Sequence, residues 1–337
     1  MTALERHVEN YLAVRRGLGF QLTHEQRMLN RFVAFMDGAG ESTLTVELAL
    51  RWATMPTGVG HAYLAQRMRA VRGFARYLHG IDPATEIPPL ELLPARKHRP
   101  TPHIYTRAEI AALLAAARAL RPALRAATME TLIGLLACTG LRDGEAFALD
   151  RHDIDRANGL LRIRDSKFGK SREVVIHDST LAALDAYLAR RDELRPGGDR
   201  VCVFVSSWGA RLSHKSVHRS FDQIRRASGV TGPAPGRRPR LHDLRHTFAV
   251  NTLLGWYRNG DDVAAKLPLL STYLGHVDPA ATYWYLSAVP ELLGLAAGRL
   301  EQRENGDDSS DREVALLLRE QERVRHWRAP RARRAEQ

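Results

Sequence analysis

Four separated stretches of the sequence carry side chains that could act together on a phosphate group. They are residues 139–145, Lys167, residues 241–249 and residues 273–285. Arginine is always charged and presents planar, paired donors to phosphate, and histidine exchanges protons near neutral pH. A tyrosine phenol becomes a nucleophile when a neighbouring base accepts its proton. Side chains of these types can carry out nucleophilic attack on a phosphate ester when a fold brings them together.

Local spacing indicates how the chain positions these side chains. Gly140 ends a predicted helix, which places Arg142 at the junction with the next helix. Glu145 follows three residues later, where its carboxylate could hold the guanidinium. His242 and Arg245 are i and i+3 on a predicted helix and therefore share a face.

Each stretch by itself also has a plainer structural interpretation. An arginine after a helix end is usually a cap or a surface ion pair, and a His-x-x-Arg pair usually lies on a solvated face. Lys167 at a hairpin tip would normally be exposed, and His276 could be buried at a helix C-terminus. Tyr283, Trp284 and Tyr285 could all be core packing. Only the combination of the four stretches favours chemistry.

In this order and spacing, the stretches resemble the tyrosine recombinase (phage integrase) family over most of the chain. The family pattern T-G-L-R-x-x-E matches residues 139–145, H-x-L-R-H-[ST]-F-A matches residues 242–249, and L-G-H matches residues 274–276. The family's nucleophilic tyrosine lies nine positions after that histidine, which gives Tyr285. Tyr283, two positions earlier, is its nearest competitor.

The family lysine usually lies in a β-hairpin of pattern G-K-G-x-K-x-R, and residues 166–172 read S-K-F-G-K-S-R. Alignment on Lys170 and Arg172 gives the catalytic role to Lys167, with Lys170 as its rival because the flanking glycines are missing. The resemblance implies six catalytic residues, with Glu145 orienting the first of them. The six are Arg142, Lys167, His242, Arg245, His276 and Tyr285.

The resemblance also implies a mechanism that these residue types can perform. Arg142 and Arg245 would clamp a DNA phosphate, with His276 as a further donor, because preorganised donors stabilise developing charge. His242 would accept the proton of the Tyr285 phenol, and Lys167 would protonate the departing 5′ oxygen. The resulting 3′-phosphotyrosine bond conserves energy for religation without ATP. No carboxylate cluster for two metals accompanies the stretches, so we expect neither a metal nor a cofactor.

Composition supports a polyanionic partner. Lys+Arg total 50 against 38 Asp+Glu, a formal net charge of +12, which favours nucleic acid first and an anionic membrane surface second. No apolar run reaches the length of a membrane span, and no apolar segment typical of a secretory signal follows the N-terminus. Two cysteines suit a reducing compartment. We therefore expect a cytoplasmic, nucleoid-associated protein without a membrane partner.

Apolar periodicity predicts a mainly α fold with a small antiparallel β-sheet. We expect a helical core-binding (DNA-binding) domain over residues 1–82 and a proline-rich basic linker over 83–102. An α+β integrase-type catalytic domain would cover 103–302, followed by a polar break, a last helix and a basic tail over 303–337. Strands are predicted at 160–164, 173–176 and 201–205, and the main helices of this domain at 123–137, 179–191, 213–228 and 241–256.

Double-stranded DNA is the expected partner, contacted mostly through its phosphates. The expected DNA-binding residues lie in the linker and the hairpin: Arg96, Lys97, Arg99, Lys170 and Arg172. The family resemblance implies a synaptic tetramer on DNA, with possible partner recombinases. A C-terminal helix, at 290–300 or 313–324, would dock on a neighbouring subunit.

The residues around Tyr285 bear on the biological role. The stretch T-Y-W-Y-L-S-A at 282–288 differs from the T-x-x-Y-x-H ending of chromosome-resolving Xer proteins and favours integration, excision or transposition of a mobile element. The alternatives are a non-catalytic DNA-binding accessory protein of the same fold, Xer-like chromosomal or plasmid resolution, and a topoisomerase-like relaxase.

Overall fold

The structure is a computed structural model, and it describes residues 2–93, 101–166, 170–232, 237–276, 278, 280–288 and 290–304. The chain divides into two units, Met1–Pro100 and Thr101–Gln337, and each is described by itself. Within the described residues the fold is mainly helical with one small antiparallel sheet, which confirms the predicted fold class.

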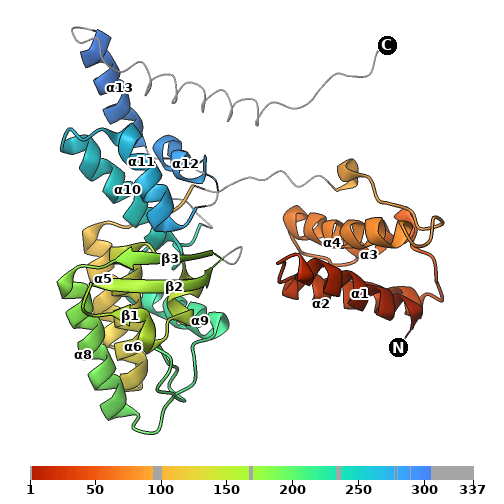
Figure 1. The fold of residues 1–337 in the computed structure, drawn as a ribbon, viewed down its shortest axis with the longest axis horizontal. Coiled ribbons are helices and arrows are strands. Elements are labelled where there is room, and N and C mark those ends of the chain that lie inside the picture. The colour runs from red at the N-terminus through yellow and green to blue at the C-terminus, as the bar shows by residue number, and fades with distance from the viewer. Residues whose placement is uncertain are drawn as a thin grey trace. The chain divides into compact units, whose positions relative to one another are not determined.

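The N-terminal unit is built from helices that surround a single apolar core (Figure 1). A capping box formed by Thr2 and Glu5 begins the first helix. Apolar side chains at helical spacing give each helix one buried face, and Phe32, Trp52 and Phe74 fill the centre. The helices are α1 (Ala3–Gly17), α2 (Thr23–Gly38), α3 (Val46–Thr54) and α4 (His61–His79).

Residues 83–93, which the prolines assigned to an extended linker, contact the helices of the N-terminal unit. The buried Arg72 donates from Nε to the carbonyl oxygen of Pro88 at 2.7 Å and from Nη2 to that of Pro89 at 2.5 Å. Glu86 Oε2 accepts from the backbone N–H of Val46 at 2.6 Å. Proline lacks an N–H but keeps its carbonyl, so a buried arginine can hold such a segment. Arg96, Lys97 and Arg99 lie outside the described residues.

The first half of the C-terminal unit packs helices and the sheet around the central helix α6, which contacts α5, α8, α9 and α10 (Figure 1). Strands β1, β2 and β3 pair antiparallel in that order, with Leu161 opposite Val174 and Ile163 opposite Arg172. The elements are α5 (Arg107–Arg118), α6 (Ala123–Thr139), α7 (Asp143–Ala148), β1 (Ile154–Asp155), β2 (Leu160–Ser166), β3 (Lys170–Val175), α8 (Asp178–Leu194) and α9 (His214–Ala227), with a 3-10 turn at Arg151–Asp153. The N-terminal unit has a 3-10 turn of its own at Leu90–Leu92.

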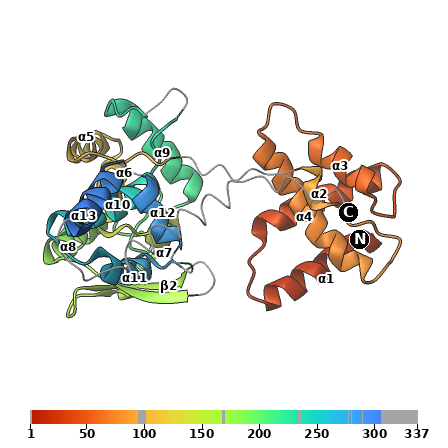
Figure 2. The same ribbon diagram turned by 90° about the horizontal axis from the view of Figure 1, so that it is seen from above.

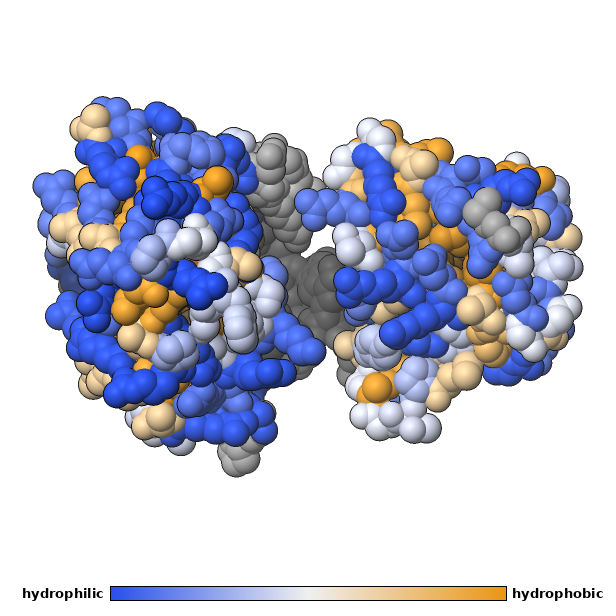
Figure 3. Space-filling model, turned by 90° about the horizontal axis from the view of Figure 1, so that it is seen from below, coloured by the Kyte–Doolittle hydropathy of each residue, from blue (hydrophilic) through white to orange (hydrophobic). Residues whose placement is uncertain are grey.

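Among the described residues of the C-terminal unit, four further helices (Figure 2) pack around a second apolar cluster. They are α10 (Asp243–Arg258), α11 (Val263–Leu274), α12 (Ala280–Ala288) and α13 (Pro290–Glu304). Contacts of α10 with both α6 and α11 join the two halves of the unit. None of the described helices combines the length and apolar character needed to cross a membrane. The face of the molecule in Figure 3 is mostly hydrophilic, with scattered apolar patches.

The strand predicted at residues 201–205 is wrong. Residues 202–205 of this apolar run are buried and Val201 is exposed, and the run forms only isolated bridges, Asp150 with Cys202 and Val205 with Arg211. Arg191 supplies hydrogen bonds instead, to the carbonyl oxygens of Cys202 and, at 2.9 Å, of Val203. A short apolar run can therefore be buried without a strand partner when a side chain satisfies its backbone. The second proposed docking helix, 313–324, lies outside the described residues.

Candidate active site

A glycine turn places Arg142 at the start of α7. Helix α6 ends at Thr139 and is capped by Gly140, which has φ 61°, and a Cβ there would lie 2.5 Å from Cδ1 of Phe248. Only glycine fits this conformation in this space. Arg142 then caps α7: its backbone N–H donates to Glu145 Oε2 at 3.0 Å, and its Nη1 donates to Glu145 Oε1 at 2.6 Å. Glu145 thus holds both the backbone and the guanidinium of Arg142.

Two arginines lie against the C-terminal ends of helices α6 and α11. Arg245 donates to the carbonyl oxygens of Gly140 at 2.7 Å and Leu274 at 2.6 Å. Arg142 donates to the carbonyl oxygen of Gly275 at 2.6 Å. Helix C-termini present unpaired carbonyls and a negative dipole end, which stabilise cations. Each guanidinium has five N–H donors, so groups beyond these bonds can face an anion.

Glu145 is the buried anion that joins Arg142 to Arg172. Arg172 donates to Glu145 Oε1 at 2.9 Å and Oε2 at 2.8 Å, and its Nε donates to the carbonyl oxygen of Tyr273 at 2.8 Å. Burial by itself would raise the pKa of Glu145, but the hydrogen bonds and charges of Arg172 and Arg142 outweigh it and lower the pKa to about 2. The carboxylate is therefore ionised throughout the physiological pH range.

Replacing Glu145 with glutamine is expected to lower the free energy of unfolding at neutral pH by roughly 3 kcal/mol. The pKa of Glu145 falls from 4.5 to about 2 on folding, so its stabilisation is complete above pH 4.5 and is lost as the pH falls towards 2. Urea unfolding across this range should show a weaker pH dependence in Glu145→Gln. Glu173→Gln, at an exposed position on β3, is the control, and an equal loss in both variants would contradict the prediction.

Gly275 closes α11 beside the same arginines. It has φ 67°, and the backbone N–H of His276 then donates to the carbonyl oxygen of Ser271 at 2.9 Å, which turns the chain back into the site. A Cβ at Gly275 would lie 2.8 Å from Nη1 of Arg172. Glu145 holds that guanidinium with two hydrogen bonds, so it has little freedom to move away.

Gly275→Ala is therefore expected to lower the free energy of unfolding by at least about 2 kcal/mol, from left-handed backbone strain and a weakened Arg172–Glu145 pair. Gly255→Ala in α10 is the matched control because a Cβ there meets nothing within 4 Å. That variant should be neutral or up to about 1 kcal/mol more stable. Urea unfolding of both variants tests the difference, and similar stabilities would refute the explanation.

His242 lies at the N-terminus of α10, facing the first residue of α7. Its Nδ1 is 4.0 Å from Asp143 Oδ1. Burial is the main cause that lowers the pKa of His242; the charge of Asp143 opposes the shift, and the charges of Arg245 and Arg240 add to it. A lowered pKa keeps the imidazole neutral at pH 7, the form that accepts a proton.

Tyr285 is buried between two histidines. It is 1% exposed, its hydroxyl is 3.1 Å from Nδ1 of His246, and its ring stacks on His276 with centroids 6.3 Å apart. His276 Nδ1 is 2.6 Å from Oγ1 of Thr282, which fixes the imidazole against α12. Tyr285 is also close to Arg245. Burial and the charge of Arg142 lower the pKa of Arg245 to about 10, whereas the nearby Tyr285 and Glu145 act to raise it.

The structure therefore brings together most of the residues that the sequence singled out. Arg142, Glu145, His242, Arg245, His276 and Tyr285 gather where α6, α7, α10, α11 and α12 meet. Lys167 and the side chain of Lys170 lie outside the described residues. Arg172, expected on the DNA-contacting surface, lies elsewhere: its side chain is 11% exposed and its guanidinium is bound to Glu145 and Tyr273.

Sequence reasoning missed two residues that line this site. His246 contacts Tyr285, and it lies four residues after His242, on the same helical face, so its spacing was an available signal. Asp143 faces His242, but it occupies a variable position of the arginine motif and gave no separate signal. In the described residues, two groups of histidines and carboxylates are close enough to share a metal ion: Asp143, His214 and His218, and Asp150, His152 and Asp153.

Comparison with known proteins gives consistent matches in sequence and fold. A family model described as the phage integrase family matches residues 104–291. The protein y4rB of Sinorhizobium fredii, named as an integrase/recombinase, is 44% identical over 309 residues, 90% of this chain and 98% of that protein. Tyrosine recombinase XerD of Caulobacter vibrioides is 31% identical over 239 residues, 70% of this chain and 74% of that protein.

Solved structures share the fold as well, and two of them serve as examples. The Tn1549 transposon integrase, in complex with transposon right end DNA, has a TM-score of 0.60 at 16% identity and covers 88% of this chain and 98% of its own. A lambda integrase dimer bound to a COC′ core site has a TM-score of 0.57 at 18% identity, covering 84% of this chain and 94% of its own. At these identities the likeness concerns the fold alone.

Proposed function

Because the chain belongs to the phage integrase family and is a tyrosine recombinase, an enzyme that breaks and rejoins DNA, we propose that it cuts DNA through a covalent bond to Tyr285. The observation that carries this assignment is the meeting of Arg142, Arg245, His276 and Tyr285 at one place. These residues come from four elements separated by up to 143 positions in the sequence.

The proposed reaction is a transesterification at phosphorus. The Tyr285 oxygen forms a bond to the phosphorus of a DNA phosphodiester while the bond from phosphorus to the 5′ oxygen breaks. His242 accepts the phenolic proton, and Lys167 gives a proton to the departing 5′ oxygen. Arg142 and Arg245 balance the negative charge on the non-bridging oxygens. Attack by another 5′ hydroxyl reverses these steps and reseals the strand without a fuel molecule.

The buried position of Tyr285 adds a requirement to this scheme. With the phenol 1% exposed and bonded to His246, a phosphate reaches it only after Tyr285 or its surroundings move. If Tyr285 itself moves, its hydrogen bond to His246 must break. Before that movement the phenol is bonded to His246, whose imidazole centroid lies 5.2 Å from that of His242.

The partner in this scheme is double-stranded DNA, and the proposed assembly is a synaptic tetramer on two DNA sites at the nucleoid. The net charge of +12 supports a polyanionic partner. Integration, excision or transposition of a mobile element is the favoured role, supported by two relatives named as integrase/recombinases that are 44% and 38% identical. Xer-like resolution is the alternative role for the same chemistry.

A nicked suicide substrate tests the proposal. The nick lets the short fragment that bears the new 5′ hydroxyl diffuse away after cleavage, so a covalent protein–DNA adduct accumulates and can be separated on a denaturing gel. Peptide mapping of that adduct should place the DNA on Tyr285, and a chelator should leave the yield unchanged. Attachment to Tyr283 would make Tyr283 the nucleophile in place of Tyr285. A complete absence of adduct on the DNA sequence that the protein recognises would favour the non-catalytic accessory role.

A further inference from the structure

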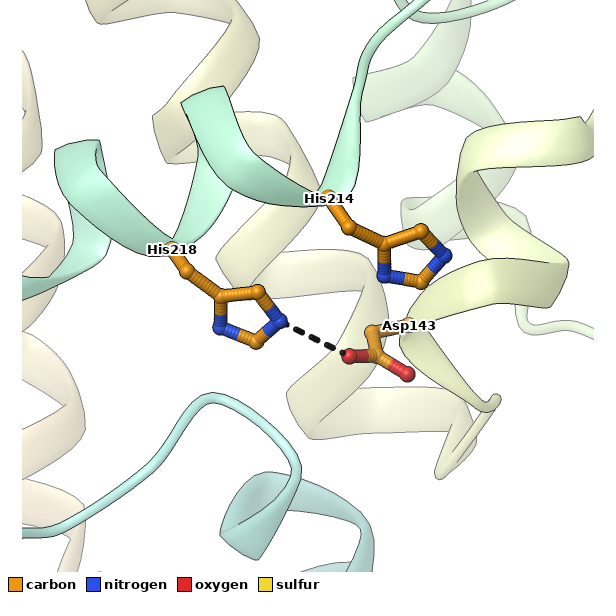
Figure 4. Close-up of side chains that lie close together, drawn as sticks. All are labelled: Asp143, His214 and His218. Carbon is orange, nitrogen blue, oxygen red and sulfur yellow. Dashed lines mark ion pairs between the residues drawn. The ribbon is translucent and has the colours of Figure 1, made fainter. Parts of the chain in front are cut away.

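Two histidines of α9 and the first residue of α7 form a cluster beside Arg142. Figure 4 shows His214 and His218, one helical turn apart, both directed toward Asp143. One ligand atom of each residue lies within 4.8 Å of the others, and His218 Nε2 is 3.5 Å from Asp143 Oδ2. The two imidazole rings are nearly parallel, with an interplanar angle of 19°.

We propose that Asp143, His214 and His218 bind one divalent transition-metal ion, with zinc as the reference ion. Two imidazoles and one carboxylate suit zinc, nickel or copper, whereas magnesium and calcium prefer oxygen ligands alone. Histidines at i and i+4 on a helix form a recurrent chelating pair. Tetrahedral ligands about 2 Å from zinc are about 3.3 Å apart. Both histidines are exposed, so small rotations can close the remaining gap.

The charges in the cluster favour a cation over a DNA phosphate. A carboxylate between the two imidazoles would repel a phosphate oxygen but contributes a strong ligand to a metal ion. In the described residues, the basic side chains within 4.0 Å of the Asp143 carboxylate are the imidazoles of His218 and His242, and no arginine pairs with it. The hydrogen bonds of the described residues leave both ring nitrogens of His214 available.

The second group, Asp150, His152 and Asp153, provides a useful contrast. Arg164 pairs with both of its aspartates, and Arg211 also pairs with Asp150. A metal ion there would have to displace guanidinium groups that already neutralise the carboxylates. The cluster at Asp143 is therefore the stronger of the two metal sites that the described residues offer.

A bound ion would join α9 to the turn that carries Arg142. Oδ2 of Asp143 faces the histidines, whereas Oδ1 accepts from the Gly144 N–H at 3.0 Å and faces His242. Coordination through Oδ2 keeps the Oδ1 hydrogen bond and fixes the first turn of α7 against α9. A bound ion would then make the turn that carries Arg142 more rigid without supplying any group to the reacting phosphate.

Calorimetric titration of the full chain, without a polyhistidine tag, with zinc chloride tests this inference. The expected stoichiometry is one ion per chain, and cobalt chloride should give the visible absorption bands of a site containing nitrogen ligands. His214→Gln and His218→Gln should each weaken zinc binding by at least about tenfold, since even outer-shell partners contribute 10–100-fold. Zinc should also raise the melting temperature of the unaltered protein more than that of either variant.

His152→Gln is the matched control, because His152 is an exposed histidine in the competing group. The His152→Gln variant should bind zinc with the same affinity as the unaltered protein. Loss of binding in this variant alone would show that the ion binds to Asp150, His152 and Asp153 instead. Failure of the unaltered protein to bind one ion would overturn the inference, as would equal affinity in the His214→Gln and His218→Gln variants. Weaker DNA binding by these variants with unchanged zinc affinity would assign the histidines to phosphate contact. None of these outcomes depends on adduct formation at Tyr285.

Discussion

Tyr285→Phe is expected to abolish the covalent protein–DNA adduct while leaving DNA binding intact. Phenylalanine keeps the ring that stacks on His276 and fills the same buried volume, so the packing of α12 is preserved. It removes the only atom of the side chain that can bond to phosphorus. Strand cleavage on a nicked substrate and DNA binding by gel shift measure the two properties separately.

Tyr283→Phe is the control for this experiment, because Tyr283 is the competing nucleophile two positions earlier on the same helix. It should retain at least half of the adduct yield. If Tyr283→Phe loses the adduct and Tyr285→Phe keeps it, the nucleophile is Tyr283 and the histidine spacing misled the assignment. A loss of folding in Tyr285→Phe would appear as a lowered melting temperature, which distinguishes it from a chemical loss.

Arg245→Lys is expected to slow strand cleavage by roughly 10²–10³-fold, the loss seen when one preorganised donor is removed from an oxyanion site. Arg245 binds the carbonyl oxygens of Gly140 and Leu274 at once and still has N–H groups for a phosphate. A lysine ammonium is a compact point charge that lacks the planar fork needed to reach both carbonyls and the phosphate. Single-turnover cleavage at saturating protein is the appropriate measurement.

The same substitution should also destabilise the protein, by about 1–3 kcal/mol, because at least one helix-end carbonyl loses its buried partner. Arg258→Lys, at the exposed end of the same helix, is the control and should change neither property measurably. Cleavage at the normal rate in Arg245→Lys would exclude Arg245 from phosphate binding and leave it a structural role at the two helix ends. A loss of rate without a loss of stability would show that the helix-end contacts contribute little.

The sequence by itself determined the local features of this protein. Helical spacing predicted the helices of the C-terminal unit to within a few residues, and the glycines at 140 and 275 mark turns that the structure confirms. These features follow from a few neighbouring residues, since backbone preferences and capping act over one or two turns. The order and spacing of the arginine, histidine and tyrosine stretches also indicated the family, which the comparisons confirm.

Only the tertiary structure decided which groups the charged side chains contact. Arg172 reads as a surface cation, yet it binds Glu145 across 27 positions and the carbonyl of Tyr273 across 101. The burial of Tyr285 on His246, and the approach of Asp143 to His214 and His218, likewise join segments that are distant in sequence. No local pattern encodes such pairs. They depend on how the helices pack and on which polar or charged groups become buried, because a buried group without a partner is destabilising.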